Sequence, residues 1–316
     1  YGGTEAEYND QAIKNVWATI DGSSKFKQQL DFTGDYEVID VNNWNGTGAY
    51  PTTTISLDKT NMYMTQRSAG KYEAFNFMDK IIAGEGNFDV APVNYTQMQQ
   101  LFIMSPLQET EEAHGYGMLM DGAWWTNEAR DVFSRLEQTG RPGAKERKFV
   151  FMPMPTPSGE HSKSVFISQN ESFGFINKNC NNVEACKTFF QYLHTTQAMC
   201  DFTLSTGTTR ALNYTLPNCK FGEDISYFTS SIIAMKNDGD THYEIVYPYT
   251  DNEIVRANTQ MFDYRKTWPF KAVLAGTDTV KPFVEMSNGK CNAYEYFVGH
   301  YNYYNQTWNN NLQGVK

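Results

Sequence analysis

The sequence predicts an α/β protein with two lobes, and three observations lead to this prediction. Segments with apolar residues at helical spacing alternate along the chain with short apolar runs of strand length. At 316 residues the chain is longer than the usual size of one hydrophobic core. Residues 111–133 predict a strand, a turn and a helix in direct succession, which is the repeating pattern of α/β folds.

The N-terminal segment predicts two helices and then a strand. Apolar residues from Ile13 to Ile20 recur at helical spacing, Gly22 breaks the pattern, and a second short helix extends to Leu30. Residues 36–39 predict a strand, because they carry β-branched and aromatic side chains.

Residues 42–50 have the composition of a loop that carries two aromatic side chains, Trp44 and Tyr50. Exposed aromatic residues in a loop are candidates for ligand binding. Packing of both rings within the loop is the alternative, and the sequence leaves the choice open.

Two further helices lead to the centre of the chain. An apolar stripe predicts a helix over residues 72–82, ended by Gly84 and Gly86. Residues 94–104 predict a second, shorter helix.

The rest of the chain is expected to be organised around the segment 111–133. Residues 116–120 alternate as in a short buried strand, and Asp121-Gly122 supplies a turn. The following helix is expected to begin with Thr126 or Asn127 as its cap.

Two adjacent tryptophans, Trp124 and Trp125, lie at this predicted strand-to-helix corner. Open α/β sheets bind ligands at the carboxyl ends of their strands, and an indole offers a broad apolar face with one N–H donor. This combination suits the apolar face of a sugar ring. Alternatively both indoles fill the core, as most tryptophans largely do.

The C-terminal half predicts short strands followed by helices. The expected strands are 148–152 and 172–176, and the expected helices are 183–193, 197–204, 225–235, 254–261, 271–275 and an aromatic-rich one after Val280. Asn181-Asn-Val-Glu184 is a capping signal for the first of these helices, and Gly207 is expected to stop the second. Cys186, Phe189 and Leu193 lie on one face of the first helix.

Composition excludes several function classes. The net charge is −10 and no basic cluster occurs, which argues against binding of nucleic acid. No run of about twenty apolar residues exists, so no membrane-spanning segment is predicted. The five cysteines, Cys180, Cys186, Cys200, Cys219 and Cys291, lack zinc-site spacing. One or two disulfides are compatible with an exported protein, and their pairing stays open.

Motifs of catalysis are missing from the sequence. Neither a Gly-x-Ser-x-Gly elbow, nor a phosphate loop ending in Gly-Lys-Ser/Thr, nor a His-Glu-x-x-His zinc motif occurs. A pair of glycosidase carboxylates is compatible with the many acidic residues, but no pair stands out. Aromatic residues make up 15% of the chain, and such platforms with scattered polar groups favour binding over catalysis. No cofactor and no metal are expected.

From about Thr60 onward the order of elements resembles the carboxyl-terminal part of the extracellular solute-binding proteins of ABC importers, the class with the maltose- and oligosaccharide-binding proteins. The likeness rests on the helix 72–82, on Glu112-Ala-His-Gly-Tyr-Gly-Met-Leu-Met-Asp-Gly-Ala-Trp124, on Phe151-Met-Pro-Met-Pro155, on Phe173-Gly-Phe-Ile176, on the helix from Val183, on Gly207-Thr-Thr-Arg-Ala211 and on Ala275-Gly-Thr-Asp-Thr-Val280. The resemblance implies a type II periplasmic-binding-protein-like fold.

The resemblance also implies site residues. The family places the Trp of Asp/Asn-Gly-x-Trp in its ligand cleft, which corresponds to Trp124, with Trp125 sharing or replacing that role. A second cleft aromatic corresponds to Tyr264. Glu171 and Arg210 border segments that face the cleft, where they are expected to bond sugar hydroxyls or, alternatively, to form surface salt bridges.

One departure concerns the first lobe. Family members begin with an additional stretch that builds most of that lobe, and no counterpart precedes Tyr1. We therefore expect residues 1–222 to form the second lobe, residues 223–275 to return to the first lobe, and residues 276–316 to be closing helices packed on the second lobe. A removed targeting segment or a fragment explains the start at Tyr1 equally well.

The sequence thus predicts an exported, monomeric, non-enzymatic binding protein, lipid-anchored in its precursor, that captures an oligosaccharide and delivers it to the permease subunits of an ABC importer. The alternative is a secreted carbohydrate-active enzyme or a glycan-binding module without a transport role.

Overall fold

The computed structural model combines many helices with few strands. It describes residues 6–58, 60–83, 94–104, 116–140, 147–154, 163–167, 174–209, 219, 225–238, 243–246, 252–253, 276 and 280–311. The helices expected at 254–261 and 271–275 lie outside these residues.

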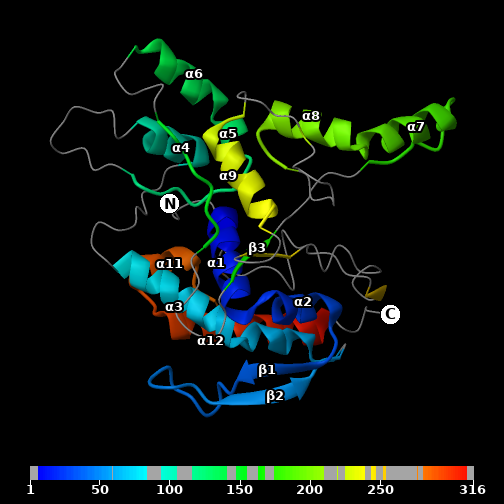
Figure 1. The fold of residues 1–316 in the computed structure, drawn as a ribbon. Helices are drawn as coiled ribbons and strands as arrows, with labels where there is room; N and C mark the ends of the chain where they lie inside the picture. The colour runs from blue at the N-terminus through cyan, green and yellow to red at the C-terminus, as the bar shows by residue number, and fades with distance from the viewer. Residues whose placement is uncertain are drawn as a thin grey trace.

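The described elements form a lower and an upper body in Figure 1. The lower body contains α1 (Ala6–Asp21), α2 (Ser23–Asp31), β1 (Asp35–Ile39), β2 (Thr52–Ser56), η1 (Met62–Arg67), α3 (Ala69–Ala83), α11 (Phe283–Ser287) and α12 (Ala293–Asn311). The upper body contains α4 (Tyr95–Met104), α5 (Trp125–Glu128), α6 (Arg130–Gln138), α7 (Val183–Leu193), α8 (Thr196–Thr206) and α9 (Tyr227–Lys236). The strands β3 (Ser164–Ile167) and β4 (Tyr243–Val246) pack on the lower body, and Val165, Ile167 and Val246 belong to its hydrophobic core.

The lower body is built around one hydrophobic core. The apolar stripe of α1, with Trp17 at its centre, packs against α3, and α12 packs against both α3 and η1. The aromatic residues of α12 enter this core, and Phe297, Tyr304 and Trp308 are buried there. The expectation that the aromatic-rich C-terminal segment forms a packed helix is confirmed.

The Asp21 carboxylate, at the end of α1, connects three segments of the lower body. It is buried and accepts hydrogen bonds from Trp17 Nε1 (2.7 Å), Tyr36 Oη (3.3 Å), the Gly70 amide (3.1 Å) and the Ser68 hydroxyl. Burial, and next the charge of Asp21, raises the pKa of Tyr36 well above its usual value, so this phenol remains a donor. The carboxylate therefore ties α1 to β1 and to the start of α3.

A buried amine lies beside this core. Lys71 of α3 contacts Gln66 Oε1, and its Nζ lies 2.7 Å from His300 Nδ1. Burial lowers the pKa of Lys71 well below its usual value, because the charged ammonium loses its hydration.

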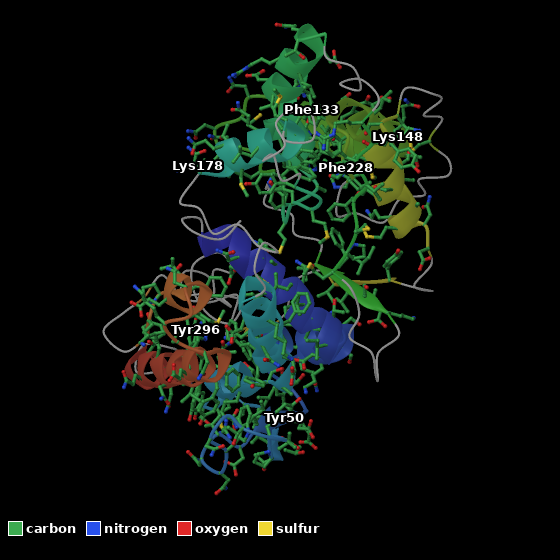
Figure 2. All side chains as sticks on the ribbon, turned by 90° about the vertical axis from the view of Figure 1, so that its left-hand side faces the viewer. Tyr50, Phe133, Lys148, Lys178, Phe228 and Tyr296 are labelled. Carbon is green, nitrogen blue, oxygen red and sulfur yellow. A yellow bond between two sulfur atoms is a disulfide. The ribbon has the colours of Figure 1, made fainter. Side chains whose placement is uncertain are left out.

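The upper body has a second, smaller core. Trp125, Val132 and Leu136 of the corner helices pack there against Ile103 of α4 and Phe228 of α9. Figure 2 shows Phe133 and Phe228 in this body and Tyr50 and Tyr296 in the other.

The two cores differ from the expected domain division. Residues of 6–83, β3, β4 and 280–311 share the first core, whereas α4 to α6 and α9 form the second. Residues 1–222, expected to form one lobe, therefore contribute to both cores. The C-terminal α12 completes the first of these cores by packing on α3 and η1.

The strands include pairings that the sequence did not predict. β1 pairs with β2 in antiparallel fashion, and β3 pairs with β4 in parallel, with Val165 opposite Glu244. The second edge of β3 lies on α1, where Thr19 Oγ1 accepts from the Val165 amide and Asn15 Oδ1 accepts from the Ile167 amide. Residues one turn apart on α1 thus satisfy backbone donors of β3.

Three expected strands are not found. Residues 116–120 do not pair with another strand among the described residues, and Met118 is 81% exposed. Residues 148–152 also form no strand, because the Phe151 amide donates to Ser231 Oγ of α9 (2.8 Å) instead of a neighbouring strand. The described part of the third, residues 174–176, has no strand either.

Helix boundaries follow their local signals more closely. Gly22, with φ of 80°, separates α1 from α2. Asn182, one residue after the expected cap Asn181, caps α7 by accepting from the Ala185 amide (3.0 Å), so that Glu184 lies at the second helical position and not the third. Gly207, with φ of 70°, ends α8 as expected. At the corner, however, Trp124 and not Thr126 or Asn127 occupies the cap position, and its side chain makes no capping hydrogen bond.

No helix in the described part of the chain is long and apolar enough to cross a membrane.

Candidate functional site

The candidate site is the corner formed by residues 121–128, and its two tryptophans have opposite environments. Trp124 is 43% exposed, whereas Trp125 is 4% exposed. The Trp125 ring contacts Phe102, Phe149 and Phe228 with centroid distances of 5.6, 5.2 and 5.7 Å. The expectation that Trp125 shares or replaces the role of Trp124 is therefore corrected, because its faces are occupied by other rings.

The Trp124 indole lies directly over Gly122. A Cβ added to Gly122 would be 2.1 Å from Trp124 Cζ3, so any side chain at this position would displace the ring. Glycine at residue 122 thus allows the six-membered ring to rest against the backbone. The six-membered ring of the indole lies against Gly122 in this way, while a large part of the side chain remains accessible to solvent.

Two carboxylates are joined beside this indole by one buried amide. Gln99 of α4 is 1% exposed, and its Nε2 donates to Asp121 Oδ2 (3.2 Å) and to Glu128 Oε2 (2.9 Å). The Asp121 carboxylate also accepts from the Gly122 amide (2.7 Å). The segment 121–128 therefore carries two carboxylates, joined through Gln99, and one partly exposed indole.

Asp121 has a strongly shifted pKa. Burial raises it from 3.8 to about 7, the hydrogen bonds from Gly122 and Gln99 lower it, and the charge of Glu128 adds to the rise. Near neutral pH this group therefore exists both as an acid that donates and as a carboxylate that accepts.

We expect this shift to make the effect of Asp121→Asn depend on pH. A carboxyl whose pKa is raised in the folded state contributes stability that is fully present below pH 3.8 and is lost as the pH rises through about 7. The free energy of unfolding of the variant should therefore increase relative to that of the wild type between pH 4.5 and 8. Urea unfolding at pH 4.5, 6 and 8 measures this difference, and a constant difference would contradict the shift.

The C-terminal end of α8, at Thr206 and Gly207, contacts the same corner. Asn127 Nδ2 donates to the Thr206 carbonyl, and a Cβ added to Gly207 would lie 3.9 Å from Thr126 Oγ1. Thr229 Oγ1 of α9 donates to the Gly207 carbonyl (2.9 Å). The corner, the end of α8 and the start of α9 thus form one hydrogen-bonded unit.

The other predicted site residues lie apart from the corner or outside the described residues. Trp44 is buried in the lower body, where its ring packs edge-on against Tyr50, Tyr72 and Tyr294 and its Nε1 donates to the Thr47 carbonyl. The choice between ligand binding and loop packing at Trp44 is thus decided for packing. Glu171, Arg210 and Tyr264 lie outside the described residues.

Three polar residues of the corner were not chosen as site candidates from the sequence. Asp121 was interpreted only as part of a turn, although it stands in the Asp-Gly-x-Trp segment. Glu128 and Gln99 carry no local signal, since only the packing of α4 against the corner brings Gln99 between the two carboxylates. Within the described ranges, no group of three metal-ligating side chains is close enough to hold a metal ion.

Comparison of the chain with protein-family models, curated proteins and solved structures finds no match.

Proposed function

We propose that the chain is an extracellular solute-binding protein that captures a carbohydrate at the corner 121–128 for import by an ABC transporter. The observation that carries the proposal is the exposed Trp124 indole, which rests on Gly122 beside the carboxylates of Asp121 and Glu128. A flat aromatic face binds the apolar face of a sugar ring, and carboxylates accept hydrogen bonds from its hydroxyls.

Two features support a clamp-like mechanism. The two hydrophobic cores are separate, which suits closure of one body against the other on a bound ligand. The hydrogen bonds of Asn127 and Thr229 connect the corner to α8 and α9, so a ligand at Trp124 acts on the whole upper body. The permease subunits then sense the closed state, and the protein works as an exported monomer, without cofactor or catalysis.

Titration with a panel of mono- and oligosaccharides tests the proposal, with tryptophan fluorescence and calorimetry as readouts. We expect one class of glycan to give saturable binding, and Trp124→Ala to weaken it at least about tenfold, or about 1.4 kcal/mol. Tyr227→Ala is the matched control, because Tyr227 is an exposed aromatic residue of the same body that lies on α9. A folded sample that binds no saccharide, or equal losses in both variants, would contradict the proposal.

The raised pKa of Asp121 favours a second candidate, a carbohydrate-active enzyme. A carboxyl that stays protonated to about pH 7 next to a second carboxylate has the chemistry of a general acid with its partner. Release of reducing sugar from a glycan, abolished by Asp121→Asn and retained in Asp131→Asn, would favour the enzyme over the binding protein. If the glycan is unchanged after prolonged incubation, the result favours the binding protein over the enzyme. A glycan-binding module without a transport role is distinguished by the lack of interaction with a permease.

A further inference from the structure

The segment that precedes α7 brings two cysteines together. The Cys180 amide donates to the Asn177 carbonyl (2.9 Å) in a tight turn, and Asn182 then caps α7. Cys186 lies in the first turns of the helix, where its amide donates to the Asn182 carbonyl (3.2 Å). This geometry places Cys180 Sγ 3.3 Å from Cys186 Sγ.

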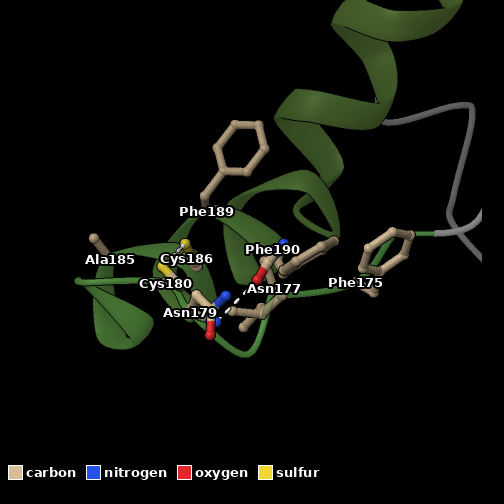
Figure 3. A pocket seen from close by; sticks show the side chains of 9 residues that line it. Phe175, Asn177, Asn179, Cys180, Ala185, Cys186, Phe189 and Phe190 are labelled. Atoms are coloured by element: carbon tan, nitrogen blue, oxygen red, sulfur yellow. Dashed lines mark hydrogen bonds between the residues drawn. The ribbon is translucent and has the colours of Figure 1, made fainter.

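The two cysteines line an open pocket of about 740 Å³. Its other walls include Phe175, Phe189 and Phe190, and Figure 3 shows Cys180 and Cys186 next to each other with Phe175 farther along the pocket. The Phe190 ring lies against Gly174, where an added Cβ would come within 2.3 Å of the ring.

No residue of α7 is buried, so the hydrophobic cores do not hold this region together. Phe175 and Phe189 are exposed, although Phe189 and Cys186 belong to the apolar face of α7 that the sequence predicts. The predicted apolar face of this helix is therefore not buried. A covalent connection between the turn and the helix would supply the constraint that packing does not.

The chain already contains one disulfide. Cys200 of α8 is bonded to Cys219, across a separation of 19 residues. A chain that forms such a bond belongs to the class of proteins that fold in an oxidising compartment. Cys180 and Cys186 would be exposed to the same oxidising environment.

We propose that Cys180 and Cys186 form a second disulfide, which ties the turn at residues 177–180 to the first turns of α7 and leaves Cys291 as the single thiol. The two sulfurs, 3.3 Å apart, need to approach by only about 1.2 Å to reach the bonded distance of about 2.05 Å. This proposal stands independently of carbohydrate binding.

The oxidant is a small-molecule disulfide such as glutathione disulfide. The thiolate of one cysteine attacks a sulfur of glutathione disulfide, forms a mixed disulfide and releases one glutathione thiolate. The second cysteine, as its thiolate, attacks the protein sulfur of the mixed disulfide and releases the second glutathione. The two protons lost by the protein thiols are taken up by the two glutathione thiolates.

The bond would fix one wall of the pocket. Closing the short loop between the two cysteines removes conformational freedom from the turn. Cys180 and Asn177 then keep their positions opposite Phe190. Without the bond, the turn is held by its own hydrogen bonds and by the contact of Phe190 with Gly174.

Thiol counting on the full chain tests the proposal. The protein is prepared without reductant, equilibrated with glutathione disulfide at about pH 8.5, alkylated in denaturant and measured by intact mass spectrometry. We expect one adduct, alkyl or glutathionyl, in the wild type, none in Cys291→Ser, two in Cys180→Ser and five alkyl adducts after full reduction. Peptide mapping should join Cys180 to Cys186.

Three or five adducts in the unreduced wild type would overturn the proposal. A linkage of Cys180 or Cys186 to any other cysteine would overturn it as well. Both outcomes are read from the wild-type chain, so they do not depend on the folding of a variant.

Discussion

Replacement of Asp21 by alanine should lower the free energy of unfolding by about 3–5 kcal/mol. Trp17, Tyr36, Ser68 and Gly70 all donate to this buried carboxylate, and alanine offers them no acceptor. Trp17 Nε1 keeps Ser68 Oγ as a second acceptor (3.0 Å), whereas the Gly70 amide and the Ser68 hydroxyl lose the Asp21 oxygen without access to the water that they have in the unfolded chain. Lys25, whose side chain is partly exposed, also loses its ion pair with Asp21 but can turn to water.

The control is Asp35→Ala, which removes a carboxylate at an exposed position at the start of β1. An exposed substitution of this kind changes stability by no more than about 0.5 kcal/mol. Denaturant unfolding of both variants measures the difference. The comparison requires that the slope of the free energy of unfolding against denaturant concentration is the same in both variants. Equal losses at residues 21 and 35 would show that the Asp21 hydrogen bonds do not stabilise the lower body.

Trp125→Ala should destabilise the protein by about 3–5 kcal/mol, because it leaves a cavity in the smaller core. Phe102, Phe149 and Phe228 surround the Trp125 ring and lose their shared partner. Trp124→Ala should cost less than about 1 kcal/mol, since much of this side chain is in water. Chemical denaturation of the two variants under identical conditions compares the adjacent residues directly.

Trp125→Phe is a useful intermediate variant, because it keeps an aromatic ring among the phenylalanines. We expect its loss of stability to lie between those of the wild type and Trp125→Ala. If the alanine variants at 124 and 125 were equally stable, or if their order were reversed, the assignment of Trp125 to the core would be wrong.

Local signals predicted the helices well. The break at Gly22, the capping Asn182 and the stop at Gly207 each act within a few residues of the helix end. A helix closes its backbone hydrogen bonds inside one segment, so its limits are encoded by nearby residues. The same reasoning correctly placed α3, α4, α9 and the aromatic α12.

The strands were predicted less well, because a strand is completed by a distant partner. β3 pairs with β4 and with side chains of α1, and both partners are far away in the sequence. Residues 148–152 have a strand-like composition, but the hydroxyl of Ser231 takes the hydrogen bond of Phe151. The composition of a segment indicates its preference for strand conformation, but it does not identify the segment with which it pairs.

At the candidate site, the sequence by itself determined the adjacent tryptophans and the helix that follows the Asp-Gly segment, whereas the strand expected before it is not found and the helix begins earlier than expected. Only the tertiary structure decided which indole is exposed, because the ring cluster of α4, α6 and α9 surrounds Trp125 and leaves Trp124 at the surface. It also decided that Gln99 joins Asp121 to Glu128 and that Cys200 pairs with Cys219. Backbone conformation depends mainly on neighbouring residues, whereas burial, pKa shifts and side-chain pairing depend on segments that meet only after the chain has folded.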